Sequence, residues 1–258
     1  MQYVAVGDSF TEGMGDELPN GTARGWADLV AAGFAGARDE PVHYANLAVR
    51  GRLLDVIVAE QLPAALAMTP PPTLMTFNGG GNDLMRPGAD PGRLLAQTER
   101  AVRWVLDAGV ELVLLSGADP SARLPFGRAM HRKAAELTDG LLDLAARHGV
   151  LMVNAFGDAE LSRAPYWSAD RLHLAPAGHR RVAGLVLAAL GHEVAAEAVD
   201  PGPEVPRKLP AEVRYYREHV LPWVGRRLRG RSSGDGQRGK RPEWTVVSGL
   251  DPVGTLGA

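Results

Sequence analysis

Two hydrophobic patterns alternate over the first three-quarters of the chain. Short apolar runs are typical of buried strands, and longer segments with apolar positions every three or four residues are typical of amphipathic helices. The expected strands are Tyr3–Val6, Val42–Asn46, Thr73–Phe77, Glu111–Ser116 and Val150–Val153. The expected helices are Trp26–Ala35, Leu53–Ala67, Pro91–Ala108, Arg128–His148 and Pro176–Leu190. This order predicts an α/β fold in which crossover helices join parallel strands.

A three-layer, flavodoxin-like sandwich with a central parallel sheet of about five strands satisfies this order of elements. In such a sheet the loops at the carboxyl ends of the strands gather at one edge, where ligands bind. Polar or Gly-rich stretches follow three of the expected strands, at 7–15, 48–52 and 78–83, and a fourth, 167–173, precedes the last helix. We therefore expect four loops to meet at one site.

The pattern changes after residue 190. Prolines at 201, 203, 206 and 210 indicate a linker, a helical pattern follows over 211–228, and a Gly/Ser/Arg-rich run extends to Pro242. We divide the chain into an α/β domain (1–191), a Pro-rich linker (192–210), and a basic C-terminal helix with a flexible tail (211–258). From Pro201 onward, 11 Lys and Arg face six Asp and Glu. A solvated surface explains this basic region more simply than a nucleic-acid or membrane partner, and no nucleic-acid partner is predicted.

Composition narrows the class of protein. The 258 residues are 45% hydrophobic and 22% charged, which is typical of an ordinary globular protein. The absence of cysteine excludes disulfides, thiolate metal sites and a cysteine nucleophile. No window approaches 18 uninterrupted apolar residues, and the first residues lack the pattern of a signal peptide. We expect a cytoplasmic protein with no membrane span.

Ser9 is the candidate nucleophile. It follows the first strand in Gly7-Asp8-Ser9-Phe10, where its hydroxyl can project into the crevice at the edge of the sheet. Taken alone, such a serine is more often a helix cap or part of a phosphate-binding loop. The residues in the later loops favour catalysis instead.

Those loops supply a base and hydrogen-bond donors. Asp170 and His173 lie three residues apart ahead of the last helix, so one turn can hold both, with Asp170 accepting one imidazole N–H while the other nitrogen faces Ser9. Asn82 follows three glycines and offers a side-chain amide to an oxyanion, and Gly51 can add a backbone N–H.

The four blocks together resemble those of the SGNH (GDSL-type) serine hydrolases. The resemblance rests on Gly-Asp-Ser at 7–9, Gly51, Gly-Gly-Asn-Asp at 80–83 and Asp-Arg-Leu-His at 170–173, and it spans about residues 2–190. It implies a triad of Ser9, His173 and Asp170, and an oxyanion hole formed by the Ser9 and Gly51 N–H groups and the Asn82 amide. Phe10 stands where the usual motif has leucine, and the second block rests on the position of Gly51 more than on a sharp motif.

The resemblance implies hydrolysis of a carboxylic ester, the acyl ester of a small molecule, lipid or sugar. Two alternatives remain: acyl transfer by the same triad, and a non-catalytic flavodoxin-like module that binds phosphate or flavin. The other six histidines show no metal-ligand spacing, so neither a metal nor a cofactor is predicted. Among them, we expect His179 to be an exposed helix residue. Phe10, Leu84, Tyr166 and Trp167 flank the motifs and are candidates either for an acyl pocket or for the core.

Overall fold

One mixed sheet of six strands, in the order β5-β4-β3-β1-β2-β6, organises the molecule. The computed structural model describes residues 1–37, 40–124, 127–192, 200–204, 215, 217–218 and 234–248. The first five strands pair in parallel, and β6 pairs antiparallel with β2. The strands are β1 (Gln2–Val6), β2 (Val42–Asn46), β3 (Leu74–Phe77), β4 (Glu111–Leu115), β5 (Leu151–Val153) and β6 (Arg241–Val247).

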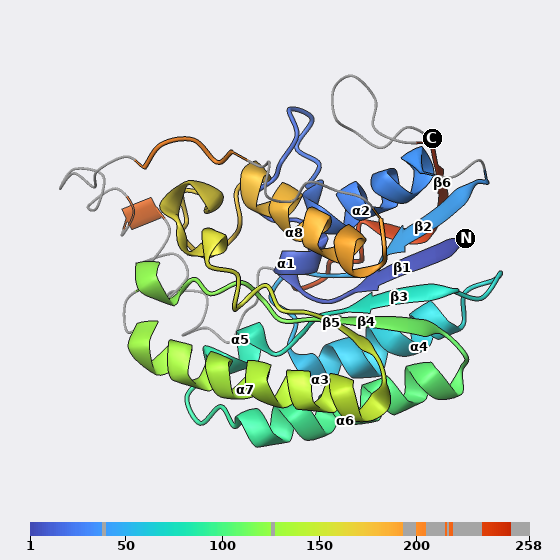
Figure 1. The fold of residues 1–258 in the computed structure, drawn as a ribbon, viewed down its shortest axis with the longest axis horizontal. Helices are drawn as coiled ribbons and strands as arrows, with labels where there is room; N and C mark the ends of the chain where they lie inside the picture. The colour runs from blue at the N-terminus through green and yellow to red at the C-terminus, as the bar shows by residue number, and fades with distance from the viewer. Residues whose placement is uncertain are drawn as a thin grey trace.

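Helices cover both faces of this sheet, which gives three layers (Figure 1). Side chains alternate along each strand, so Tyr3 and Ala5 pack on the face covered by α2 and α8, while Val4 and Val6 pack under the other helices. The helices are α1 (Ser9–Glu12), α2 (Gly25–Gly36), α3 (Leu54–Val56), α4 (Leu62–Leu66), α5 (Gly81–Leu84), α6 (Pro91–Asp107), α7 (Gly127–His148) and α8 (Pro176–Ala189). No helix among the described residues is long and apolar enough to cross a membrane.

The expected fold class is confirmed, and the expected strands and helices of the first 190 residues lie within two residues of their observed bounds, with one local exception. The segment expected as one helix over Leu53–Ala67 is divided into α3, a π-helical turn at Ile57–Gln61, and α4. Two short helices, α1 and α5, begin inside the loops that carry Ser9 and Asn82.

The end of the chain differs from the prediction. Residues 241–247, expected in a flexible tail, form β6 and pair with β2 from Val42↔Val247 to Asn46↔Arg241. The prediction of flexibility is therefore wrong for this stretch. Of its residues, Arg-Pro-Glu-Trp-Thr-Val-Val, only Val247 is buried, so the strand depends more on backbone pairing with β2 than on apolar burial. The helix expected over 211–228 lies almost entirely outside the described residues.

Candidate active site

The turn after β1 presents Ser9 at the carboxyl edge of the sheet. Ser9 is the first residue of α1, and Asp8 caps this short helix by accepting the Phe10 N–H at 3.1 Å. A Cβ at Gly7 would lie 2.5 Å from Thr11 Oγ1, so only glycine allows this close turn. Ser9 thus lies at a helix start, where backbone N–H groups lack partners within the helix.

Gln61, at the end of the π-helical turn, holds the same turn from the other side. Its side-chain amide donates to the Gly7 carbonyl at 2.9 Å and accepts the Gly7 N–H at 2.8 Å. This pair of bonds satisfies the backbone of Gly7 just beyond the end of β1. Sequence analysis missed the role of Gln61, because nothing in the helical pattern of 53–67 marks the π turn.

Asp170 and His173 lie together in the turn before α8. Asp170 Oδ2 lies 2.5 Å from His173 Nδ1. The other oxygen, Oδ1, accepts the backbone N–H groups of Leu172 and His173, each at 2.9 Å, and the Ser168 hydroxyl at 2.6 Å. Burial acts to raise the pKa of the Asp170 carboxyl, but the hydrogen bonds and charge of His173 outweigh it and hold that pKa well below its usual range. The carboxylate is ionised and fixes the orientation of the imidazole.

The turn that carries His173 packs against the loop that follows Ser9. A Cβ at Gly15 would lie 2.1 Å from the Leu174 carbonyl oxygen and 3.3 Å from His173 Cβ. Burial raises the pKa of the Asp8 carboxyl to about 6, although the nearby charge of His173 lowers it. The first and last of the four predicted loops therefore meet, as expected.

Asn82 connects the first loop with the second. Its Nδ2 donates to Asp8 Oδ2 and to the Arg52 carbonyl, both at 3.1 Å, so both amide hydrogens have acceptors. The next residue, Asp83, accepts the Leu54 N–H at 3.0 Å and holds the start of α3. The predicted loops around residues 8, 52 and 82 thus meet in one hydrogen-bonded group.

Glu12 fixes the chain next to Gly51. Its carboxylate accepts the Arg50 backbone N–H at 2.6 Å and the Arg50 guanidinium at 2.9 Å and 2.5 Å. Glu12 is buried and lies one turn after Ser9 on α1. Because Gly51 itself has a φ of +73°, this position favours glycine. The Glu12–Arg50 pair, which sequence analysis missed, holds the loop of Gly51 against the helix of Ser9.

The expectation for His179 is wrong: the side chain is fully buried in α8. Its Nδ1 accepts the Trp26 N–H at 3.2 Å, and its Nε2 lies 3.0 Å from the Met14 carbonyl. Burial lowers the pKa of His179, which keeps the ring neutral with its proton on Nε2. Its partners lie about 150 residues away along the chain, so the pattern of the helix gives no sign of them.

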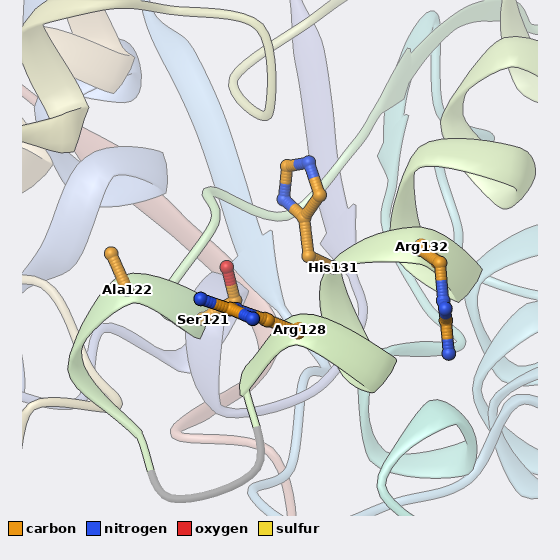
Figure 2. A pocket seen from close by; sticks show the side chains of 5 residues that line it. All are labelled: Ser121, Ala122, Arg128, His131 and Arg132. Carbon is orange, nitrogen blue, oxygen red and sulfur yellow. The ribbon is translucent and has the colours of Figure 1, made fainter.

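The four candidate pocket residues all pack in or against the hydrophobic core. Leu84, Tyr166 and Trp167 are buried in the two hydrophobic clusters, while Phe10 is half-buried and packs on Trp26. A pocket of about 360 Å³ lies at the start of α7 (Figure 2). It is lined by Ser121, Ala122, Arg128, His131 and Arg132. Within the described ranges, no three His, Asp or Glu side chains gather as a metal site.

The sequence matches the model of one protein family over residues 5–181, the GDSL-like Lipase/Acylhydrolase family. The chain belongs to this family. No curated protein matches the sequence. The match confirms the resemblance drawn from the four blocks. It shows that this GDSL-like acylhydrolase is a carboxylic ester hydrolase and not a non-catalytic binding module.

Solved structures with the same fold resemble this GDSL-like acylhydrolase. TesA is 24% identical, with a TM-score of 0.59, over 74% of this chain and 98% of TesA. LAE5, an alpha/beta hydrolase enzyme from the metagenome of Lake Arreo, is 23% identical, with a TM-score of 0.62, over 74% and 94%. Axe2, an acetylxylan esterase from Geobacillus stearothermophilus, is 17% identical, with a TM-score of 0.62, over 74% and 94%.

The three matches cover about three-quarters of this GDSL-like acylhydrolase. They cover nearly all of TesA, LAE5 and Axe2. The family match ends at residue 181, within α8, so β6 lies beyond it. The C-terminal strand is therefore outside the part of the chain that the family model recognises.

Proposed function

We propose that this acylhydrolase cleaves esters with Ser9 as nucleophile, His173 as general base and Asp170 as the partner that orients the imidazole. The observation that carries the proposal is the 2.5 Å contact between Asp170 Oδ2 and His173 Nδ1, in a turn packed against the loop of Ser9. The carboxylate accepts the Nδ1 proton, which leaves His173 Nε2 as the atom that takes the proton from Ser9.

In the first half of the reaction, Ser9 Oγ attacks the ester carbonyl carbon and its proton moves to His173 Nε2. Asp170 stabilises the imidazolium that forms. The tetrahedral intermediate then expels the alcohol, which takes the proton back from Nε2, and an acyl group remains on Ser9. In the second half, water gives a proton to Nε2 as its oxygen attacks the acyl carbonyl carbon. The second tetrahedral intermediate then breaks its bond to Ser9 Oγ, which takes the proton from Nε2, and the carboxylic acid is released.

The oxyanion of each tetrahedral intermediate needs donors that are already oriented. We assign these to the backbone N–H groups of Ser9 and Gly51 and to the Asn82 amide. Because both Asn82 hydrogens already have acceptors, the oxyanion would replace one of them, either Asp8 Oδ2 or the Arg52 carbonyl. The Glu12–Arg50 pair supports the proposal for Gly51, since it holds this loop in place before substrate binds.

The substrate we propose is the acyl ester of a small molecule, lipid or sugar, in the cytoplasm. Acyl transfer would use the same acyl-enzyme, with a bound alcohol in the place of water. Product analysis with a short-chain aryl ester and added acceptor alcohols distinguishes the two reactions: free acid indicates hydrolysis, and a new ester indicates transfer.

Ser9→Ala and His173→Ala test the assignment. Each should lower kcat for a short-chain aryl ester by about 10³-fold or more, and the double variant should be hardly worse, because the two residues act as one unit. A fluorophosphonate probe should label Ser9 in the wild-type protein. Ser162→Ala, which alters an exposed serine, serves as the control and should leave kcat unchanged. Near wild-type turnover in Ser9→Ala would refute the assignment.

A further inference from the structure

The C-terminal segment places a lysine inside the catalytic domain. Lys240 directly precedes β6, and its side chain is only 12% exposed. Its ammonium group lies 3.0 Å from Asp28 Oδ1 and donates to the Ala23 carbonyl at 3.0 Å and to the Arg24 carbonyl. The ammonium therefore closes the loop that leads into α2 and pairs with a buried carboxylate of that helix.

A line of buried polar groups continues from this ion pair. Asp28 Oδ1 accepts the Tyr44 hydroxyl at 2.7 Å, and the Tyr44 oxygen accepts Asn46 Nδ2 at 2.9 Å. The same Nδ2 donates to the Thr11 carbonyl at 3.0 Å. Burial raises the pKa of the Tyr44 phenol well above its usual range, so Tyr44 stays a donor to Asp28.

This line, which we call the Lys240 chain, consists of Lys240, Asp28, Tyr44, Asn46 and the Thr11 carbonyl. Thr11 lies two residues after Ser9 on α1. The hydrogen bonds of the Lys240 chain therefore link the C-terminal segment to the helix that begins with Ser9. Buried polar groups that are all satisfied hold one arrangement, whereas a buried charge that loses its partner forces its neighbours to rearrange. Without the ammonium, Asp28 would either keep its charge with no counter-ion or take up a proton. Either change would disturb the hydrogen bond that Asp28 accepts from the Tyr44 hydroxyl.

The C-terminal segment also touches the other loops of the site. A Cβ at Gly234 would lie 2.0 Å from the Arg50 carbonyl oxygen, next to Gly51. The Arg171 guanidinium lies over the Tyr215 ring at 3.9 Å from its centre, in the turn that holds Asp170 and His173. Segments from beyond the family match therefore contact both halves of the candidate active site.

We propose that Lys240 is a positioning residue, which acts through the Lys240 chain to hold α1, and with it Ser9, in the orientation that attacks the ester. The inference rests on the proposed role of Ser9. It gives the basic C-terminal region a structural function: Lys240 supplies the counter-ion for Asp28, a buried carboxylate of α2 that is joined to α1 by hydrogen bonds through Tyr44 and Asn46.

Two variants interrupt the Lys240 chain at different points. Lys240→Met removes the counter-ion, and Tyr44→Phe keeps the ion pair but removes the hydroxyl that joins Asp28 to Asn46. Because misplacing a reacting group by about 1 Å can cost about 10²-fold in rate, we expect Lys240→Met to lower kcat about tenfold or more. Tyr44→Phe should lower kcat several-fold. In both variants KM should change less than twofold, since the substrate contacts are intact.

Val247→Ala is the matched control, because Val247 lies in β6 and is buried in the apolar core, and its apolar side chain makes none of the hydrogen bonds of the Lys240 chain. It should lower the melting temperature but leave kcat unchanged at a temperature well below melting. Lys240→Met combined with Asp28→Asn removes both charges while an amide oxygen can still accept the Tyr44 hydroxyl, so this double variant should recover most of the lost kcat.

The rate of fluorophosphonate labelling at Ser9 separates the possible outcomes. Slower labelling in Lys240→Met and Tyr44→Phe, with normal labelling in Val247→Ala, supports the proposal. Wild-type kcat and labelling in Tyr44→Phe would overturn it, even if Lys240→Met failed to fold. An equal loss of kcat in Val247→Ala would also overturn it, by showing a general effect of β6 on stability. Absence of labelling at Ser9 in the wild-type protein would instead refute the proposed nucleophile.

Discussion

Asp170→Asn is the most informative single change, because it alters the tautomer of His173 with little change in shape. The three groups that donate to Asp170 Oδ1 can all donate to an amide oxygen. The amide nitrogen then takes the place of Oδ2, 2.5 Å from His173 Nδ1, and makes Nδ1 the acceptor. The ring proton moves to Nε2, so Nε2 can no longer accept the proton of Ser9.

The size of the effect follows from this loss of the base. A wrong tautomer in a serine triad costs about 10⁴-fold in kcat, or about 5.4 kcal/mol of transition-state stabilisation. Steady-state kinetics with a short-chain aryl ester should show the loss in kcat, with KM nearly unchanged. Asp158→Asn is the control, since this carboxylate pairs with Arg181 at 2.8 Å and touches no proposed catalytic residue. Activity of Asp170→Asn within tenfold of the wild type would refute the assigned role of Asp170.

Three further changes test other parts of the site. Asn82→Ala should lower kcat by about 10²–10³-fold, and a change confined to KM in steady-state kinetics would mark Asn82 as an ordinary substrate contact. Because burial raises the pKa of Asp8 to about 6, Asp8 should add up to about 3 kcal/mol to the protein's free energy of unfolding near pH 4, and this contribution should be lost as pH rises to about 6. In urea titrations the difference between the wild type and Asp8→Asn should therefore shrink from pH 4 to 6, and a difference that does not change with pH would argue against a raised pKa. Burial lowers the pKa of His179, so the unfolded state binds more protons and stability should drop as pH falls below about 6.5. His179→Gln should weaken that dependence, and an unchanged pH dependence would contradict the burial argument.

The parts of the fold that could be predicted from the sequence are those whose structure is determined by residues close together in the sequence. Val42–Asn46 forms a strand with the predicted bounds, since a short run of residues that are almost all buried has a local pattern of its own. The four loops were also predictable. A Gly-rich or polar stretch that follows a buried strand must lie at the carboxyl edge, whichever helices cover the sheet.

Features that depend on distant partners were missed. The pattern of the helix suggests that His179 is exposed, but the fold brings it against Trp26 of α2 and Met14 of the loop that follows α1. Lys240 looks like one more charge in a basic tail, and only the pairing of β6 with β2 brings it to Asp28. In both cases the deciding contact joins residues that are far apart in sequence, and a local pattern carries no information about them.

The position of β6 also affects the order of folding. Its partner β2 is synthesised about 200 residues earlier, as the pair Val42↔Val247 shows. While the chain emerges from the ribosome, β2 is therefore an open sheet edge, the kind of edge that invites pairing with other molecules. The other outer strand, β5, has only three residues and presents little edge at all. β6 thus covers the long edge of β2, so a nascent or truncated chain that lacks β6 exposes an edge that is paired in the folded protein.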